Sequence, residues 1–355
     1  MNARCAVFAL AFLGCGRRST PTIHRDDPKP DASAEVIVDA EVGTTSTFEG
    51  RRLHRNEGAA SCVATDALYV RSNSSVLGFS GSGAPKVVTL EPSFATAARW
   101  DARGDDYAWS ESDEEVGPHA MLRVSVGAGA STLHPGSDYL KPTLCGGWTV
   151  HPLATAYPGA PGGHAARTDH LVIRSLRGAG YRELTSGPYV SLHVFGCAMD
   201  HALVLFNDIG SPELHDVSLA TGTKRLLAKR AGEWWLASAA VDANAALLAT
   251  NSTGAPGGRV DAVERIELTG AAPPKKLFAP AADEEFWAIF ASAGTVLVPL
   301  TISRAYGTPK EHALLVLDAR SGAELRRIRT DDDVLAAWHG DSLVWCTASG
   351  VYTLP

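Results

Sequence analysis

The feature of this sequence that most restricts its fold is a repeat with a period of 44 to 52 residues. A turn glycine recurs once per repeat, at successive intervals of 48, 49, 44, 48 and 52 residues. These glycines are Gly81, Gly129, Gly178, Gly222, Gly270 and Gly322. A period in this range, with four short strands in each unit, is typical of the blades of a β-propeller.

Short strand-like segments mark both halves of each repeat. In the first half, a strand, a polar turn and a second strand follow one another, as in Ala97–Ser110, Leu335–Cys346, Ser61–Val70 and Phe195–Leu205. In the second half, apolar residues alternate or run together before the turn glycine, as they do in strands. These later segments are Val124–Val126, Val217–Leu219, Ile266–Leu268 and Leu315–Leu317.

Tryptophans recur in two of the strand pairs. Aromatic side chains of this size contribute strongly to cores, so we expect these four to be buried between blades rather than to form a platform for sugars. They are Trp100, Trp109, Trp338 and Trp345.

The last repeat is incomplete. Six units fit between Ala59 and Thr330, and Val334–Pro355 then supplies only three strands. Because an open sheet edge invites aggregation, we expect the N-terminal side of the chain to donate the fourth strand, from Glu35–Asp39 or Thr47–Arg51. The expected fold is therefore an all-β propeller of seven four-stranded blades closed by an N-terminal strand, with six blades as the alternative.

Four of the six cysteines fall within the repeats, at Cys62, Cys145, Cys197 and Cys346. An even number of cysteines in an exported protein favours disulfides, and three pairings are possible. Cys62 and Cys346 fall in the first and last blades, which are neighbours only in a closed ring. We therefore favour Cys62 with Cys346 and Cys145 with Cys197, and the alternative is four buried free thiols.

Two segments resemble a known repeat. Tyr181–Pro188 looks like the outer strand and turn of the TolB-type, WD40-like propeller repeat, and Ala98–Trp109 looks like the inner strand pair that follows it. The resemblance covers about two blades and implies the propeller fold. It assigns no partner-binding residue to any position of this chain.

The N-terminus carries an apolar run that ends at a cysteine. One basic residue, Arg4, precedes the run, and nine apolar residues are too few to cross a bilayer, so the layout predicts a secretory signal over residues 1–14. Phe12–Cys15 resembles the lipobox of bacterial lipoproteins, which implies lipid attachment at Cys15. The alternative is an ordinary secretory signal followed by a coincidental cysteine.

The next segment predicts how the folded domain is held. Residues 15–33 are polar and rich in proline, so we expect a flexible tether ahead of a single propeller domain at 34–355. Gly16, rather than aspartate, follows the lipidated cysteine, which by analogy with enteric sorting favours the outer membrane. The membrane is thus one expected partner, reached through the lipid anchor.

Charge and missing motifs exclude several function classes. The formal net charge is −7 at pH 7, and no basic stripe or Arg-rich arm is present in the sequence, so we expect no nucleic-acid partner. CxxC, HExxH, Walker A and EF-hand motifs and the G-x-S-x-G elbow are absent, so no metal, cofactor or catalytic residue is expected. The expected assembly state is a monomer.

One face of the expected propeller carries long connections between the second and third strands of the blades. Such loops on a rigid scaffold are common binding sites. They are Ser110–His119, Tyr157–Asp169, Asn207–Glu213, Asn251–Asp261 and Ile302–Glu311. The candidate binding residues on or beside them are Asp113, Glu114, His164, Asp208, Glu213, Arg259, Asp261, Arg304 and Tyr306.

Two functions fit these features. The first is a non-catalytic module at the cell envelope that binds an unidentified envelope protein or glycan, or acts as a scaffold. The second is an extracytoplasmic enzyme such as a glycan hydrolase or lyase, which would need two carboxylates about 5 to 9.5 Å apart across one pocket. Since fold does not decide function, the geometry of this face must discriminate between them.

Overall fold

The computed structural model describes residues 50–354 except 57–60, 98, 112–120, 136–140, 157–166, 185–190, 199, 208–211, 233–234, 243, 256–257, 270–271 and 304–309. By its internal contacts the chain divides into two units, Met1–Thr45 and Ser46–Pro355, and all described residues belong to the second. Within this described part, no helix has the length and apolar character needed to cross a membrane.

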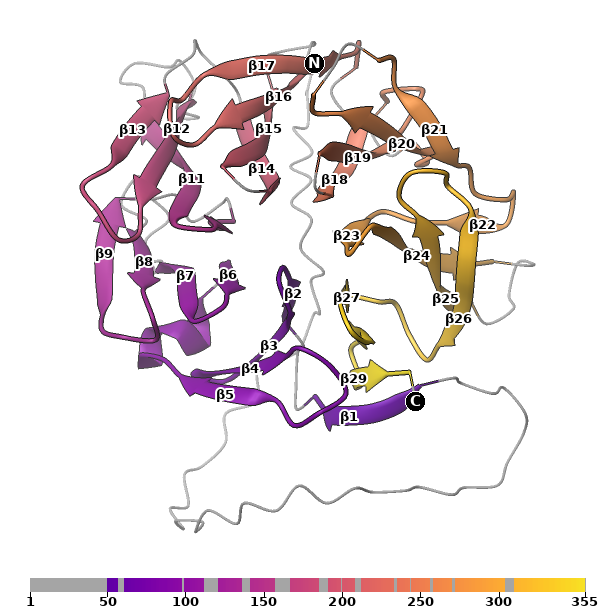
Figure 1. The fold of residues 1–355 in the computed structure, drawn as a ribbon, viewed down its shortest axis with the longest axis horizontal. Helices are drawn as coiled ribbons and strands as arrows, with labels where there is room; N and C mark the ends of the chain where they lie inside the picture. The colour runs from indigo at the N-terminus through magenta and orange to yellow at the C-terminus, as the bar shows by residue number, and fades with distance from the viewer. Residues whose placement is uncertain are drawn as a thin grey trace, which may run out of the picture. The chain divides into compact units, whose positions relative to one another are not determined.

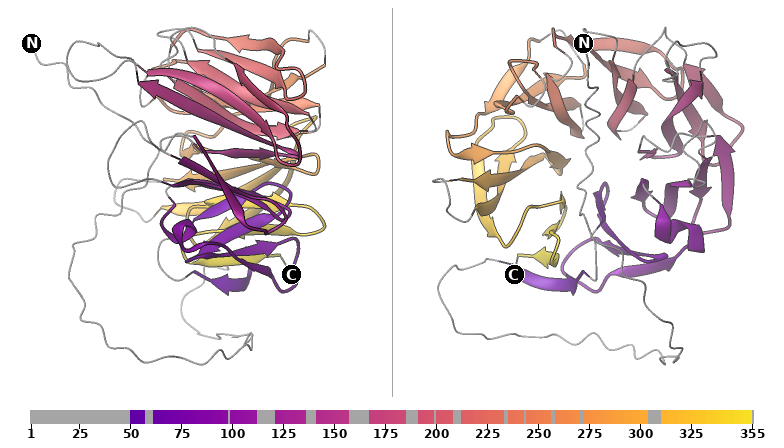
Figure 2. Two further views of the ribbon diagram at one scale, coloured as in Figure 1. Left: turned by 90° about the vertical axis from the view of Figure 1, so that its left-hand side faces the viewer. Right: turned by 180° about the vertical axis from the view of Figure 1, so that it is seen from behind.

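Seven antiparallel sheets form a closed ring of blades, with their first strands nearest the centre (Figure 1). In the side view of Figure 2, the strands run from one face of the ring to the other. The seven-bladed prediction is therefore confirmed, and the six-bladed alternative is excluded.

Blades 1 to 4 follow the chain from the inner to the outer strand. Blade 1 has β2 (Cys62–Ala64), β3 (Leu68–Ser72), β4 (Ser75–Phe79) and β5 (Lys86–Thr89). Blade 2 has β6 (Trp100–Arg103), β7 (Asp106–Glu111), β8 (Met121–Ser125) and β9 (Ser131–Pro135). Blade 3 has β10 (Thr143–Cys145), β11 (Trp148–Ala156), β12 (Arg167–Ser175) and β13 (Tyr181–Leu184). Blade 4 has β14 (Ser191–Ala198), β15 (His201–Asn207), β16 (Glu213–Ser218) and β17 (Lys224–Lys229).

Blades 5 and 6 continue the same order. Blade 5 has β18 (Leu236–Asp242), β19 (Ala245–Thr250), β20 (Ala262–Glu267) and β21 (Lys275–Phe278). In blade 6 the inner edge is split into β22 (Glu284–Glu285) and β23 (Phe290–Ser292), which both pair with β24 (Thr295–Ile302), followed by β25 (Glu311–Asp318) and β26 (Glu324–Thr330). One short 3-10 helix, η1 (Pro92–Thr96), connects blades 1 and 2.

Blade 7 joins the two ends of the described chain. It contains β27 (Ala336–His339), β28 (Leu343–Cys346) and β29 (Gly350–Thr353), and its outer strand is β1 (Arg51–Arg55). The expectation of an N-terminal closing strand is confirmed. Its position differs from both predicted segments: Thr47–Arg51 reaches only the first residue of β1, and Glu35–Asp39 lies outside the described residues.

The position of β1 follows from its one large apolar residue. Leu53 packs against a core cluster that includes Phe79 and Val351. The flanking arginines extend outward, and backbone pairing with β29 supplies the rest of the attachment. Just beyond the strand, the Asn56 amide donates to the Thr347 carbonyl at 2.8 Å, which holds the chain against blade 7.

Both favoured disulfides are present. Cys62 and Cys346 join blades 1 and 7 and are 284 positions apart in sequence. Cys145 and Cys197 join blades 3 and 4. Disulfides persist in oxidising compartments, so the pairs indicate an extracytoplasmic protein.

The core lies between neighbouring blades, which explains why the middle strands are apolar on both faces. Every residue of β19 is buried. Leu247 and Ala249 pack with side chains of blade 6, whereas Ala246 and Leu248 pack with side chains of blade 4. A strand covered on both sides carries a continuous apolar run, and such a run recurs about once per blade.

Candidate functional site

Two kinds of connection emerge on the same face of the ring, and we call this side the loop face. They are the links between the second and third strands of each blade and the links from an outer strand to the next blade, because antiparallel strands return to the same side. The second-to-third links of blades 2, 3, 5 and 6 occupy 112–120, 157–166, 251–261 and 303–310, and the blade 4 link occupies 208–212. Blades 1 and 7 have short turns at 73–74 and 347–349.

The structure describes three of the nine candidate binding residues. Glu213, Arg259 and Asp261 lie on the loop face, as expected from their positions beside long connections. The remaining candidates lie outside the described residues, as do the predicted signal, lipid site Cys15 and tether. These remaining candidates are Asp113, Glu114, His164, Asp208, Arg304 and Tyr306.

Glu213 begins β16 and is held by two basic partners of its own blade. Its carboxylate accepts from Lys229 Nζ at 2.7 Å and lies 3.0 Å from His215 Nε2. These contacts, the lysine first, lower the pKa of Glu213 below its ordinary value. The side chain is therefore an ionised carboxylate in a local network.

The blade 5 connection is organised by its own side chains. Asn251 accepts from the Thr253 backbone amide at 3.0 Å, and Asp261 accepts from the Ser252 amide at 3.2 Å. Gly254 has a φ of +61°, and a side chain there would collide with the Ala231 carbonyl. The start of this connection is therefore a structural turn, in which glycine meets the backbone requirement.

Arg259 connects this loop to the next blade. Its guanidinium donates to the backbone carbonyls of Ala281, Ala282 and Glu284. Because these bonds use both terminal nitrogens, the side chain fixes the link between blades 5 and 6 rather than pointing freely to a ligand.

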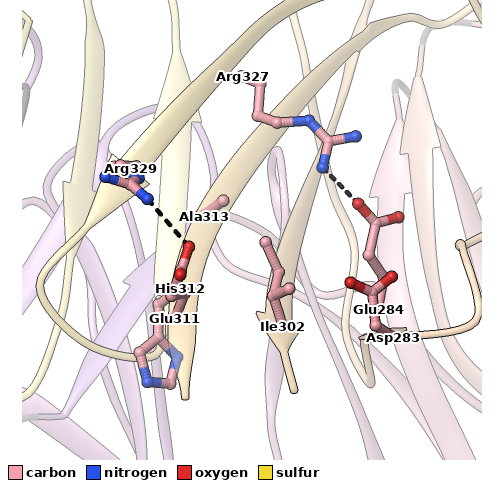
Figure 3. Close-up of a pocket in the computed structure, with 8 residues that line it drawn as sticks. All are labelled: Asp283, Glu284, Ile302, Glu311, His312, Ala313, Arg327 and Arg329. Carbon is pink, nitrogen blue, oxygen red and sulfur yellow. Dashed lines mark hydrogen bonds and ion pairs between the residues drawn. The ribbon is translucent and has the colours of Figure 1, made fainter. Parts of the chain in front are cut away.

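Beside this link, a pocket of about 300 Å³ opens at the loop-face end of blade 6 (Figure 3). Its lining combines six charged or titratable side chains with the apolar Ile302 and Ala313. The lining residues are Asp283, Glu284, Ile302, Glu311, His312, Ala313, Arg327 and Arg329. Figure 3 shows that two arginines of β26 pair with two glutamates from other strands of the blade.

The two ion pairs have different surroundings. Glu284 is buried and pairs with Arg327, and it also accepts from the Ala281 amide at 3.0 Å. Arg329 lies 3.0 Å from Glu311, and both of these side chains are accessible to solvent. Burial opposes the ionisation of Glu284, but the Ala281 amide and the Arg327 guanidinium together hold its pKa below the ordinary 4.5.

Replacing Glu284 with glutamine is expected to lower stability at pH 7 by about 1–3 kcal/mol, because Arg327 loses a buried charged partner. A lowered folded pKa means that the native state binds fewer protons than the unfolded chain near pH 4.5. The ionised Glu284 side chain therefore contributes its full stabilisation above the ordinary pKa of 4.5. This contribution declines as the pH falls through the pKa that Glu284 has in the folded protein. Urea unfolding between pH 3 and 7 should therefore show a weaker acid dependence in Glu284→Gln.

The adjacent Glu285→Gln provides the matched control, since Glu285 is on the less buried side of β22. An equal change of the acid dependence in both variants would contradict this assignment to Glu284.

The environment of Glu284 does not favour a role as a general acid near neutral pH. A glycosidase acid must hold its proton near neutral pH, which requires a raised pKa. Glu284 has a lowered pKa, and Glu311 is paired with an arginine. Within the described residues, no group of three or more His, Cys, Asp or Glu side chains is placed to hold a metal ion.

None of the pocket-lining residues is among the candidate binding residues predicted from the sequence. Glu284, Glu311 and Arg329 belong to three separate segments that meet only through the pairing within blade 6. One signal was available: Arg327 and Arg329 alternate in an outer strand and so must lie on the same face of the sheet.

The fold has relatives among solved structures. A prolyl endopeptidase matches with a TM-score of 0.58 and 12% identity over 84% of this chain and 47% of that one. The chain thus spans about half the length of this endopeptidase. The WD40 domain of Neurospora crassa Pan2 matches with a TM-score of 0.49 and 12% identity over 84% of this chain and 90% of that one.

TolB from Acinetobacter baumannii is a further similar structure. It matches with a TM-score of 0.41 and 12% identity over 77% of this chain and 64% of that one. No family model and no curated protein matches the sequence. At these identities the likeness concerns the fold alone.

Proposed function

We propose that this propeller is a non-catalytic binding module of the bacterial cell envelope, in which the loop face captures an envelope protein or a glycan. The observation that carries the proposal is the collection of long connections from blades 2, 3, 5 and 6 on one face of a disulfide-closed ring. Binding residues commonly lie on such loops, because the scaffold fixes the positions of their ends.

Two features of the described loop face support binding of a partner with little loss of conformational entropy in the propeller. The blade 5 connection is preformed by Asn251, Asp261 and Arg259. The blade 6 pocket offers arginine donors and carboxylate acceptors beside apolar Ile302 and Ala313. Preorganised surfaces lose less conformational entropy on binding, so more of the contact energy appears as affinity.

The anchor is the second half of the proposal. Lipid on Cys15 and the polar segment 15–33 would keep the propeller within reach of one membrane surface, with the outer membrane favoured by Gly16. A tethered module of this kind meets its partner at high local concentration.

Shortening the connections of blades 2, 3 and 6 to two-residue turns is expected to abolish partner capture while leaving the fold intact. The blade 5 connection is retained because Arg259 uses it to hold blade 6. The measurement is crosslinking and co-purification from membranes of the source bacterium. The same fractions test the anchor, since full-length protein should stay with the membranes and Cys15→Ser should be released.

A variant with residues 269–274 shortened, on the opposite face, is the control for loop trimming in general. If the loop-trimmed protein still captures the same partner as the full-length protein, the loop face is not the binding surface. Turnover of an envelope glycan by the full-length protein would instead support the second candidate, a hydrolase or lyase, for which the three carboxylates lining the pocket are the favourable observation.

A further inference from the structure

The outer strands of the propeller are strongly basic, although the whole chain carries a net charge of −7. The seven outer strands contain thirteen Lys and Arg residues and two acidic residues, Glu183 and Glu324. All thirteen basic side chains are exposed. The basic residues are Arg51, Arg52, Arg55, Lys86, Arg182, Lys224, Arg225, Lys229, Lys275, Lys276, Arg326, Arg327 and Arg329.

These residues are unevenly distributed around the ring. Eleven of them lie on β17, β21, β26 and β1, the outer strands of blades 4 to 7, together with a single acidic residue. The outer strands of blades 1 to 3 carry only Lys86 and Arg182. We call the outer strands of blades 4 to 7 the basic arc, and Figure 1 shows that they follow one another along the perimeter.

Protection of sheet edges does not account for this asymmetry. Lysine and arginine on an edge strand discourage pairing with another chain, and each of the seven blades has such an edge. Edge protection alone would therefore place basic residues around the whole ring. Their concentration on four adjacent blades indicates a further role for this part of the perimeter.

Neighbouring carboxylates leave an excess of positive charge. Some arc residues pair with acids of the third strands, as Arg225 does with Asp216 and Arg329 with Glu311. The third and outer strands of blades 4 to 7 together still hold twelve basic and seven acidic residues, a net charge of +5. Lys276 and Arg55 are exposed and make no ion pair within the described part of the chain.

The curvature of the basic arc favours a flexible linear polyanion over a flat anionic surface as its ligand. The four strands follow a convex perimeter, so a flat membrane can touch only part of the arc at once (Figure 1). A flexible linear chain can follow it from blade to blade. Exposed Leu226 and Leu325 lie on the same strands and offer apolar contact to a sugar ring.

From this charge and curvature we propose that the basic arc binds an acidic polysaccharide, as a second binding surface that meets the loop face at Arg327 and Arg329. The two disulfides indicate an extracytoplasmic protein, where acidic glycans rather than nucleic acids are the accessible polyanions. The basic side chains of the arc attract the acidic groups along the polysaccharide. The affinity therefore falls as the salt concentration rises.

The test uses polygalacturonate as the probe and the folded propeller in low salt. Reversing two arc charges, Arg55→Glu with Lys276→Glu, is expected to weaken binding about tenfold and to reduce its salt dependence. The control Lys86→Glu with Arg182→Glu changes the net charge by the same amount on the outer strands of blades 1 to 3, outside the arc, and it should alter affinity less than about threefold. Thermal unfolding of both variants reports whether the fold is retained.

The outcomes separate the possibilities. Loss of affinity in the arc variant alone supports the proposal. An equal loss in both variants would show a response to net charge only and would overturn it. Tighter binding to vesicles containing anionic lipid than to polygalacturonate, or no binding of polygalacturonate by the wild-type protein, would also overturn it.

Discussion

Replacing Cys62 and Cys346 together with alanine is expected to lower the free energy of unfolding by about 5 kcal/mol. The bond closes a loop between two residues that are 284 positions apart in sequence. In the chain-entropy account, a disulfide stabilises by restricting the unfolded chain, and the effect grows with the logarithm of loop length. The ring is also held at this point by the backbone pairing of β1 with β29 and by apolar packing of blade 1 against blade 7.

The second disulfide supplies the matched comparison. Cys145 and Cys197 are 52 residues apart, so replacing both with alanine is expected to cost about 4 kcal/mol. Urea unfolding of the two double variants measures the difference directly. A smaller loss in Cys62→Ala with Cys346→Ala than in Cys145→Ala with Cys197→Ala would contradict the role of the first bond as the main covalent closure.

The number of blades and the disulfide pairing could be predicted from the sequence because both follow from periodicity. A glycine turn once per unit, as at Gly222 and Gly322, marks the link from the third to the outer strand, and both residues have a positive φ in the structure. Once the chain must close into a ring, cysteines in the first and last units become neighbours. Local patterns were therefore sufficient to predict a long-range contact.

The closing strand was harder to predict because an outer strand is held mainly through its backbone. β1 has only Leu53 as a large apolar side chain, and its other four residues are basic. Segments such as Glu35–Asp39 have a more regular strand pattern. A single half-buried leucine among basic residues does not distinguish an edge strand from a loop, so the register could be obtained only from the three-dimensional contacts.

The blade 6 pocket and the basic arc were not predictable for a different reason. Glu284 and Arg329 are brought together by sheet pairing within a blade, and the arc residues recur in strands separated by most of a repeat. A search for charge runs detects neighbours in sequence, whereas a propeller places one short segment of each repeat along its perimeter. The absence of a basic stripe in the sequence is therefore compatible with a basic surface in the fold.

Trp109→Ala is expected to lower the free energy of unfolding by about 3–5 kcal/mol. The side chain is fully buried in the core shared by blades 1 and 2. Its ring meets Phe94 edge to face, with 5.5 Å between the centroids, and Phe94 makes a similar contact with Trp100. Removing the indole leaves a cavity beside two aromatic rings that β6 and η1 hold in place, so the site cannot easily collapse.

Trp287→Ala is the control, because Trp287 is 50% exposed. Its replacement should lower the free energy of unfolding by less than about 1 kcal/mol. Urea unfolding followed by circular dichroism measures both variants. Similar losses would mean that burial between blades 1 and 2 does not determine the contribution of Trp109. A large loss confined to Trp109→Ala would show that this tryptophan stabilises the junction between blades, as its place in the repeat predicts.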